Sequence, residues 1–377
     1  MKNNNLLLEF IKSESASGII LFIATLVSLI LANLDFSKSY LVFWENSFAG
    51  ISLYDVINNG LMTIFFLLVG LEIEREFYNG ELSSKNAILP VLAAIGGVIF
   101  PAFLYIAINF SNNKLNGFGI PMATDIAFLL SVLLVLGHRI PHAMKIFFIA
   151  LAIVDDICAI IVVAFFYSSS IDWRFLACTG LIILLLFFLN RKKIMLLPIY
   201  YAGGFLLWYC FLKSGIHSTI AGVILAFLIP YCENKELCPS HQLQKRLHYP
   251  VAFGIMPLFA MANTAFQINL ELISSLFSNN SLGIIIGLVL GKPIGVSLAV
   301  LVGTRINKVN LPSDMSMFHI IGGGILAGIG FTMSIFISSI AFTDKQMIES
   351  SKLAVLVSSL IAGLGGYFFL RKIKVKK

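Results

Sequence analysis

The sequence predicts an all-α polytopic membrane protein with about twelve transmembrane helices. Hydrophobic residues make up 58% of its 377 residues, charged residues make up only 12%, and the mean hydropathy is +0.93. A soluble domain carries about 25% charged residues, so this chain has too little polar surface to cover itself in water. The apolar residues form long runs without the alternation of a β-barrel, which indicates helices.

The apolar runs set the expected spans. A helix needs about 20 residues to cross the hydrocarbon core. We count twelve runs, at 16–33, 58–74, 86–109, 119–137, 143–168, 174–190, 196–212, 215–231, 249–266, 282–303, 318–342 and 350–370. The longest loops, 34–57 and 232–248, are too short to be domains, so we expect a single transmembrane domain over 1–377. The first fifteen residues are polar and the next run is long enough to span, which argues against a cleavable signal peptide.

The basic residues predict an orientation. The net charge of +7 does not indicate nucleic-acid binding, because the basic residues cluster beside the apolar runs. If the N-terminus is inside, the inner segments hold 19 Lys and Arg residues and the outer segments hold six, while Lys292 lies within a span. This asymmetry predicts that both termini are cytoplasmic.

The five cysteines are an odd number and lie mostly within apolar runs. We interpret them as small buried hydrophobic residues, an interpretation favoured over disulfides or metal ligands. They are Cys158, Cys178, Cys210, Cys232 and Cys238.

Four charged residues lie well within apolar runs, away from the ends: Asp125, Asp155, Asp156 and Lys292. A charge at the bilayer centre costs roughly 2.5–3.5 kcal/mol, so the four would cost about 10–14 kcal/mol if they faced lipid. They are therefore expected to face the protein interior or a water-filled cavity. A salt bridge that only fixes helix packing would pair Lys292 with one aspartate and leave at least two carboxylates without a basic partner.

The neighbouring carboxylates of Asp155 and Asp156 predict exchange of protons for a cation. Adjacent helical residues point about 100° apart, so the two cannot have the same role. Two ionised carboxylates about 4 Å apart repel by roughly 4 kcal/mol at an effective dielectric constant of 20. At least one is expected to hold a proton until a cation arrives, and oxygen ligands suit a hard ion such as Na⁺ or Li⁺.

Two spans, the fourth and the eleventh, are expected to be discontinuous. Pro121 follows Gly117 and Gly119 in the first, and five glycines between 322 and 330 precede Thr332 and Ser334 in the second. Half-helix ends expose partial charges, which Asp125 would offset at N-termini and Lys292 at C-termini. Paired interruptions in the two halves of a chain are typical of transporter binding sites.

A separate glycine stripe is interpreted as helix packing. It recurs at every fourth residue, at Gly283, Gly287, Gly291 and Gly295.

Together these residues resemble the bacterial NhaA Na⁺/H⁺ antiporters over nearly the whole chain, from about Ala16 to the last helix. Six motifs carry the resemblance in family order: FFLLVGLEIERE (65–76), PMATDIAF (121–128), ALAIVDDICAIIV (150–162), LKSGIHSTIAGV (212–223), GKPIGVSL (291–298) and GIGFTMSIFI (328–337). Inverted repeats with broken helices are established for this family, and the resemblance implies them here.

The resemblance also implies roles for the buried charges. Asp156 would be the principal carboxylate for the cation and the proton, with Asp155 beside it. Asp155 would pair with Lys292 in one state of the cycle and release it in another; whether Lys292 itself carries a transported proton stays open. Thr124 and Asp125 match the broken-helix motif, where they would balance helix-end charge and help to ligate the ion.

Further matches suggest residues that respond to pH. Glu72, Arg75 and Glu76 match a cytoplasmic funnel tied to pH activation, although a solvated helix end explains such a charge cluster equally well. His217 matches a family histidine linked to pH response, while a lone histidine near a membrane interface is more often only hydrogen-bonded.

Three departures from the family pattern concern regulation and assembly. Asn59 replaces an acidic residue, which removes any carboxylate role in the second span. Gln244 and Lys245 replace an acidic residue and a histidine, which puts the usual pH threshold in doubt. The segment 34–57 is shorter than in relatives that dimerise through a β-hairpin, so the resemblance leaves a homodimer open.

The resemblance implies an electrogenic antiporter of the bacterial inner membrane that extrudes Na⁺ or Li⁺ in exchange for a larger number of H⁺, driven by the proton gradient. Such a transporter is not an enzyme and needs no cofactor; its partners are membrane lipid and the transported ions, with no nucleic acid.

Three other classes remain to be weighed. An organic-anion symporter would need a cavity without a buried Lys–Asp pair. An intramembrane aspartyl protease needs carboxylates from different helices, and Ser214 with His217 lacks the G-x-S-x-G turn of a serine hydrolase. A passive channel would not pump against a gradient.

Overall fold

The structure is a computed structural model and describes residues 2–48, 50–80, 87–110, 115–168, 171–232, 238–306, 311–312 and 314–373. Seven of the basic residues used to predict orientation lie outside these ranges: Lys85, Lys114, Lys235, Lys308, Lys374, Lys376 and Lys377.

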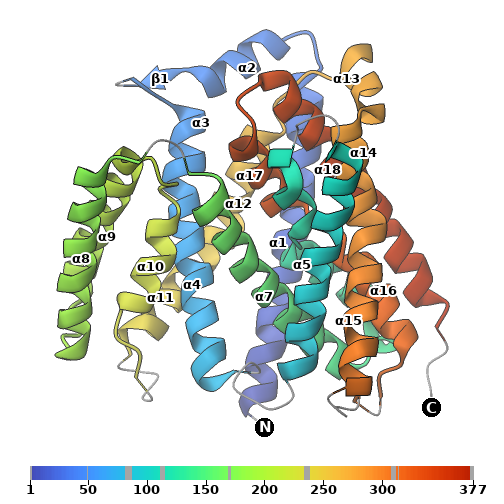
Figure 1. Ribbon diagram of the computed structural model, residues 1–377, viewed down its shortest axis with the longest axis horizontal. Helices are drawn as coiled ribbons and strands as arrows, with labels where there is room; N and C mark the ends of the chain where they lie inside the picture. The colour runs from blue at the N-terminus through green and yellow to red at the C-terminus, as the bar shows by residue number, and fades with distance from the viewer. Residues whose placement is uncertain are drawn as a thin grey trace. The chain divides into compact units, whose positions relative to one another are not determined.

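Helices account for most of the described chain (Figure 1). The α-helices are α1 (Lys2–Ala32), α2 (Ser37–Glu45), α3 (Leu53–Asp55), α4 (Met62–Asn79), α5 (Ile88–Asn109), α6 (Ile126–Leu136), α7 (His142–Phe166), α8 (Trp173–Arg191), α9 (Leu197–Ser214), α10 (Ile220–Leu228), α11 (Pro239–Pro250), α12 (Met256–Asn263), α13 (Leu270–Ser274), α14 (Asn279–Ile286), α15 (Lys292–Ile306), α16 (Met317–Ala327), α17 (Phe331–Ala341) and α18 (Lys345–Arg371). Turns of 3₁₀ helix occupy Leu115–Met122, Gly137–Arg139 and Ser275–Phe277, and π-helical turns occupy Val56–Leu61, Val251–Ile255 and Gly287–Gly291.

Seven helical segments of the described chain are long and apolar enough to cross a membrane, or nine if each of two bent helix pairs counts as one span. These nine correspond to nine of the twelve predicted spans, so the all-α polytopic class is confirmed but the number twelve is not. The three others lie at 196–212, 215–231 and 249–266. In the second of them α10 has only nine residues, whereas in the third α11, a π-helical turn and α12 follow one another without a break and α11 is polar in sequence. A helix that crosses alone needs about 20 residues.

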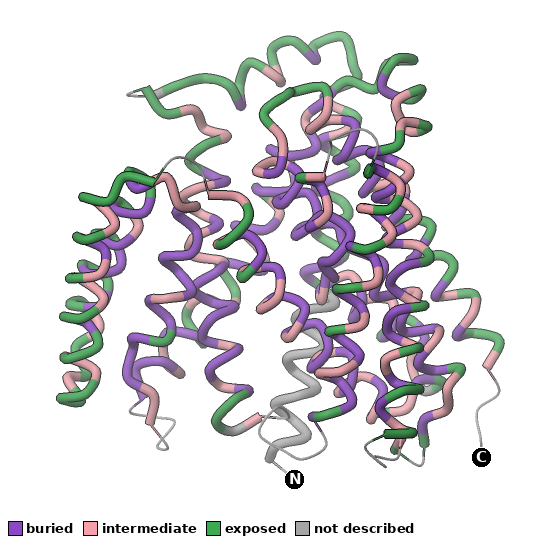
Figure 2. The backbone as a smooth tube through the Cα atoms, viewed as in Figure 1, coloured by how far each residue is buried: buried purple, intermediate pink, exposed green. Residues whose placement is uncertain are grey.

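The exposed surface of α8 shows how the chain meets lipid. Figure 2 shows this helix as largely exposed, and its outward side chains are apolar: Leu181, Leu184 and Leu185 are each more than half exposed. Apolar side chains that cover a helix in this way are typical of contact with lipid tails. The chain is a multi-pass membrane protein.

The chain divides into two compact units. Unit 1 comprises Met1–Ile23, Glu81–Ala159 and Gln267–Lys377, and unit 2 comprises Ala24–Gly80 and Ile160–Phe266. Each unit is therefore built from segments that are far apart in the sequence.

In unit 1, α5 and α15 pack side by side (Figure 1). The glycine stripe makes this close approach possible: a Cβ atom on Gly295 would lie 2.2 Å from the carbonyl oxygen of Gly96, and one on Gly291 would lie 2.9 Å from Cα of Pro101. Only a residue without a side chain fits at such distances. The interpretation of the stripe as packing is confirmed.

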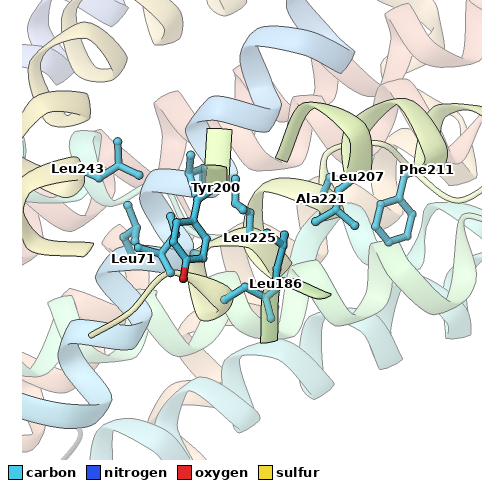
Figure 3. Packing of buried hydrophobic residues seen from close by; sticks show 12 residues of the cluster. Leu71, Leu186, Tyr200, Leu207, Phe211, Ala221, Leu225 and Leu243 are labelled. Atoms are coloured by element: carbon cyan, nitrogen blue, oxygen red, sulfur yellow. The ribbon is translucent and has the colours of Figure 1, made fainter. Parts of the chain in front are cut away.

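In unit 2, a cluster of buried apolar side chains joins α4, α8, α9, α10 and α11 (Figure 3). Tyr200 lies in this cluster, fully buried, and its hydroxyl group donates a hydrogen bond to the carbonyl oxygen of Ile194 at 3.0 Å. The labelled members are Leu71, Leu186, Tyr200, Leu207, Phe211, Ala221, Leu225 and Leu243. This packing holds α11, which is polar in sequence, against the end of α4.

The segment 34–57 contains a very short hairpin. Strand β1 (Ser47–Phe48) pairs antiparallel with β2 (Ile51–Ser52), with Ser47 opposite Ser52. Strands of two residues form a smaller hairpin than globular proteins usually have, in keeping with the shortness of the segment.

Candidate ion site

The buried charges predicted from the sequence come together in unit 1. Helix α7 presents Asp155 and Asp156, which are 1% and 5% exposed. Lys292 is the first residue of α15, directly after the π-helical turn Gly287–Gly291, and is completely buried. Its Nζ donates a hydrogen bond to Oδ2 of Asp155. The structure thus brings Lys292 and Asp155 together.

Thr124 is a second partner of Asp155. Its Oγ1 lies 2.7 Å from Oδ2 of Asp155 and 2.9 Å from the carbonyl oxygen of Ala327. A hydroxyl group has one hydrogen to donate, so Thr124 either shares it between these acceptors or favours one of them. Ala327 is the last residue of α16, so Thr124 connects the Asp155 carboxylate on α7 to the C-terminal end of α16.

Asp125 lies at the N-termini of two helices. It caps α6, where its Oδ1 accepts from the amide of Phe128 at 3.2 Å. Its Oδ2 accepts from the amide of Thr332 at 3.1 Å and from the Thr332 hydroxyl at 2.7 Å, near the start of α17. Helix N-termini carry partial positive charge, so this buried carboxylate is stabilised by two helix ends without a basic side chain.

Both helices are interrupted beside Asp125, and the two interruptions are in contact. The segment before α6 is 3₁₀-helical up to Met122, and Ala123, Thr124 and Asp125 are not helical. The pair α16 and α17 is bent by 45° at its break. The amide of Asp125 donates to the carbonyl oxygen of Ile329 at 2.7 Å, so the two breaks are hydrogen-bonded to each other. Polar backbone groups released from the helices are thus satisfied inside the protein, as lipid requires.

Thr332 was not singled out as a site residue from the sequence, although it makes two of the hydrogen bonds to Asp125. The signal that could have identified it is its place two residues after Gly330, in the first turn of the helix that restarts there.

The charges of the site do not cancel residue by residue. Three carboxylates, Asp125, Asp155 and Asp156, are buried in unit 1, where Lys292 pairs with Asp155 and a second buried lysine, Lys352, lies near the start of α18. In addition, Oδ1 of Asp155 is buried and accepts no hydrogen bond from any described residue. No group of three or more His, Cys, Asp or Glu residues in the described chain is arranged to hold a metal ion. Carboxylate oxygens that can accept a proton or a hard cation are therefore present beside a lysine that competes for them.

The candidates for pH response lie in unit 2. The guanidinium of Arg75 forms a salt bridge with Glu76, with Nη2 2.9 Å from Oε1. Glu72 is one turn earlier on α4, within the electrostatic range of Arg75, and is hydrogen-bonded by the side chain of Gln244 on α11. The structure thus places Glu72, Arg75 and Glu76 in one cluster at the end of α4.

Glu74 extends this cluster and was not among the residues singled out from the sequence. It is 4% exposed, and its Oε2 accepts a hydrogen bond from Ser240 of α11 at 2.8 Å. Glu72 and Glu74 thus both face α11, although residues two positions apart on a helix do not share a face. Only the docking of α11 reveals this role.

His217, Lys245 and Asn59 also lie in unit 2. The Nδ1 atom of His217 lies 2.8 Å from the Thr219 hydroxyl in the connection between α9 and α10. Lys245 is exposed. The carbonyl oxygen of Asn59, in the π-helical turn before α4, accepts from Thr63 at 2.6 Å and from the Trp208 indole at 2.9 Å.

Comparison with known proteins gives full-length matches. The family described as Na⁺/H⁺ antiporter 1 matches residues 8–370. The Na⁺/H⁺ antiporter NhaA 1 of Flavobacterium johnsoniae is 48% identical, over 99% of this chain and 98% of its own. The Na⁺/H⁺ antiporter NhaA of Dechloromonas aromatica is 49% identical, over 96% and 94%. That of Vibrio cholerae is 41% identical, over 98% of each chain. These matches extend across the residues of the ion site and of the α4–α11 contact.

Proposed function

Because the chain belongs to the NhaA family of Na⁺/H⁺ antiporters, we propose that it extrudes Na⁺ in exchange for H⁺ at a site formed by Asp155, Asp156 and Lys292. The observation that carries this proposal is the completely buried Lys292–Asp155 pair with a second buried carboxylate beside it. A buried pair with an adjacent acid is poorly explained as a packing device alone, because the additional charge makes the interior less stable.

The exchange follows from competition for the same oxygens. In the described state the Lys292 ammonium occupies Oδ2 of Asp155. A Na⁺ ion needs several oxygen ligands, which Asp155 and Asp156 can supply once Lys292 withdraws and the carboxylates lose their protons. Thr124 contacts the same Oδ2 atom and would help to ligate the ion. When Na⁺ leaves, protons and Lys292 return to the carboxylates.

The transport is electrogenic in this proposal. Two carboxylates bind one monovalent cation, so more than one proton can be displaced for each Na⁺ that binds. Each additional positive charge that moves inward gains about 2.3 kcal/mol per 100 mV of membrane potential, which adds to the driving force of the proton gradient. Li⁺, a hard ion of the same charge, would be transported as well.

Alternating access would use the two interrupted helices. The breaks between Met122 and α6 and between α16 and α17 are joined by Asp125, through its amide to Ile329 and its carboxylate to Thr332. Interrupted helices with facing ends surround the ion site in transporters of this kind and allow it to open to either side.

The cluster at the end of α4 would adjust activity to pH. Glu72 contacts Gln244, where the resemblance leads us to expect an acidic residue, and Arg75 is paired with Glu76. Replacement of an acid by Gln244 removes one titrating group, so we expect a weaker dependence of transport on pH than in relatives with the acid.

The remaining features of the proposal concern location and assembly. The protein would lie in the bacterial inner membrane with both termini in the cytoplasm, bind lipid, Na⁺, Li⁺ and H⁺, and need no cofactor. A homodimer that assembles through the hairpin of 34–57 would have only the two-residue strands β1 and β2 for this contact.

Proteoliposomes with an internal pH indicator test the proposed exchange. Addition of Na⁺ should move protons across the membrane in vesicles with the unchanged protein, and Asp156→Asn should abolish this movement. The matched control is Asp35→Asn, which changes an exposed aspartate in the connection between α1 and α2 and should keep the wild-type rate. Proton movement that persists in Asp156→Asn would refute the site, and its absence from the unchanged protein would refute the function.

A further inference from the structure

The connection between α10 and α11 brings two cysteines together. Cys238 precedes α11 and is completely buried, and Cys232 lies beyond the end of α10 and is partly exposed. The backbone amide of Cys232 donates a hydrogen bond to Sγ of Cys238 at 3.1 Å, and the two thiols are themselves within hydrogen-bonding range. Both thiols are free.

This geometry suits a disulfide. The sulfur of a cysteine is separated from its own amide nitrogen by Cα and Cβ alone, so the contact of Sγ of Cys238 with the Cys232 amide places the two sulfurs close together. Rotation about the side-chain bond of the partly exposed Cys232 can then complete the approach with little movement of the backbone.

We propose that Cys232 and Cys238 form a reversible disulfide, with a small water-soluble disulfide such as oxidised glutathione as the oxidant. One cysteine thiolate attacks the oxidant, forms a mixed disulfide and releases one molecule of reduced thiol. The second cysteine attacks the protein-bound sulfur of this mixed disulfide and releases the other molecule of reduced thiol. Each cysteine loses one proton, each released thiolate takes up one, and the two cysteines supply the two electrons that reduce the oxidant.

The position of the pair decides what the bridge would do. Ser240 and Gln244 follow Cys238 on α11 and contact Glu74 and Glu72 on α4. A bridge between Cys232 and Cys238 would tie the start of α11 to the end of α10. The segment that presents these side chains to α4 would then be held more firmly.

A second cysteine pair serves as an internal control. Cys178 on α8 and Cys210 on α9 are also within hydrogen-bonding range, but α8 is a membrane span covered with exposed apolar side chains. A charged, water-soluble oxidant and a thiolate are both disfavoured in lipid. If proximity alone were sufficient, both pairs would therefore form disulfides. If the oxidant must also reach the thiols from water, only Cys232 and Cys238 form one.

The surroundings of Cys232 predict how the rate varies with pH. Burial is the main cause that raises the pKa of Cys232 to about 11; Cys238 and Glu74 raise it further and Lys193 lowers it. Since the thiolate is the reactive form, the bridge should form faster at about pH 9 than at about pH 7.

The experiment uses the purified full-length protein in detergent micelles. The protein is treated with oxidised glutathione and then unfolded in sodium dodecyl sulfate, so that N-ethylmaleimide can block every remaining thiol. Peptides are then analysed by mass spectrometry. We expect a bridged peptide that contains Cys232 and Cys238, reversal by dithiothreitol, and Cys178 and Cys210 modified by maleimide. Cys238→Ser should stop at the mixed disulfide of the partly exposed Cys232 with glutathione, and Cys232→Ser should form no bridge.

Amide hydrogen exchange gives a second measurement. The amides of Pro239–Pro250 should exchange more slowly after oxidation than before, because the bridge would hold the start of α11. The proposal is overturned if Cys232 and Cys238 still react fully with maleimide after oxidation, if each accumulates glutathione without bridging, or if Cys178 and Cys210 are bridged at the same rate. None of these outcomes depends on whether the protein transports Na⁺.

Discussion

Replacement of Lys292 by methionine should destabilise the protein more than loss of an ordinary ion pair. Both side chains of the Lys292–Asp155 pair are 0% exposed, so the value of about 0.2–1 kcal/mol for exposed pairs does not apply. Removing one partner of a buried pair leaves an uncompensated charge and costs about 3–5 kcal/mol. Methionine has a similar length and no charge, so the loss reports the charge of Asp155 rather than a cavity.

A double-mutant cycle separates this charge effect from other changes. Asp155→Asn removes the charge from the other partner, and the combined variant Lys292→Met/Asp155→Asn leaves neither charge. The free energy of unfolding would be measured by denaturation in mixed detergent micelles. We expect the combined variant to be more stable than Lys292→Met alone, with an interaction energy of at least about 2 kcal/mol. A loss below about 1 kcal/mol in Lys292→Met, or strictly additive losses, would refute the account of the pair.

Three further predictions concern the helix breaks, the packing of unit 1 and the α4–α11 contact. Thr332→Val should lower the free energy of unfolding by about 1.5–3 kcal/mol, because it removes a hydroxyl hydrogen bond to the charged Asp125. Thr332→Ser keeps a hydroxyl group and should retain most of this stability. Equal stability of the two variants in the same denaturation assay would contradict the role of the hydroxyl group. Gly295→Ala should lower stability by about 1–3 kcal/mol, because the new Cβ would lie 2.2 Å from a carbonyl oxygen of α5. In the control Gly180→Ala the new Cβ meets nothing within 4 Å, so this variant should be neutral or stabilising. A loss of stability in Gly180→Ala as large as in Gly295→Ala would show that packing is not the cause. Burial, and to a smaller extent Arg75, lower the pKa of His248 in the folded protein from 6.5. The unfolded chain therefore binds more protons at this residue, so the contribution of His248 to stability is present above pH 6.5 and lost as the pH falls toward the folded pKa. His248→Gln should reduce the acid sensitivity measured by denaturation at several pH values, and an unchanged pH profile would contradict this.

The sequence was sufficient to identify the residues of the ion site because charges within apolar runs are rare and costly. Asp125, Asp155, Asp156 and Lys292 stand out for this reason alone. Which of them touch could not be inferred from spacing, because Asp155 and Lys292 are 137 positions apart. Their contact forms only when folding brings these residues of α7 and α15 together.

The partners of Asp125 show the same limit. Pro121 and the glycine cluster predicted interruptions in the fourth and eleventh spans, and in the structure three non-helical residues precede α6 and α16 is bent against α17. The hydrogen bonds from Thr332 to Asp125 required knowledge that the two breaks meet, which no local pattern contains.

Three of the twelve predicted spans are not confirmed as long apolar helices of the described chain, and the reason is different. A window of apolar residues does not show where a helix is interrupted, and the run 215–231 contains only the nine residues of α10 as regular helix. The cysteines provide a further case. Their apolar neighbours suggested burial, yet only Cys210 and Cys238 are buried, because the others lie on exposed faces or at the end of a helix.

Titration calorimetry of Na⁺ binding in buffers with different ionisation enthalpies tests the competition at Asp155 and Asp156 most directly. If Na⁺ and protons compete for these carboxylates, each Na⁺ bound should release at least about one proton, so the measured heat should change with the buffer. Asp156→Asn should lose this dependence. Binding of Na⁺ with a heat that is the same in every buffer would contradict the account.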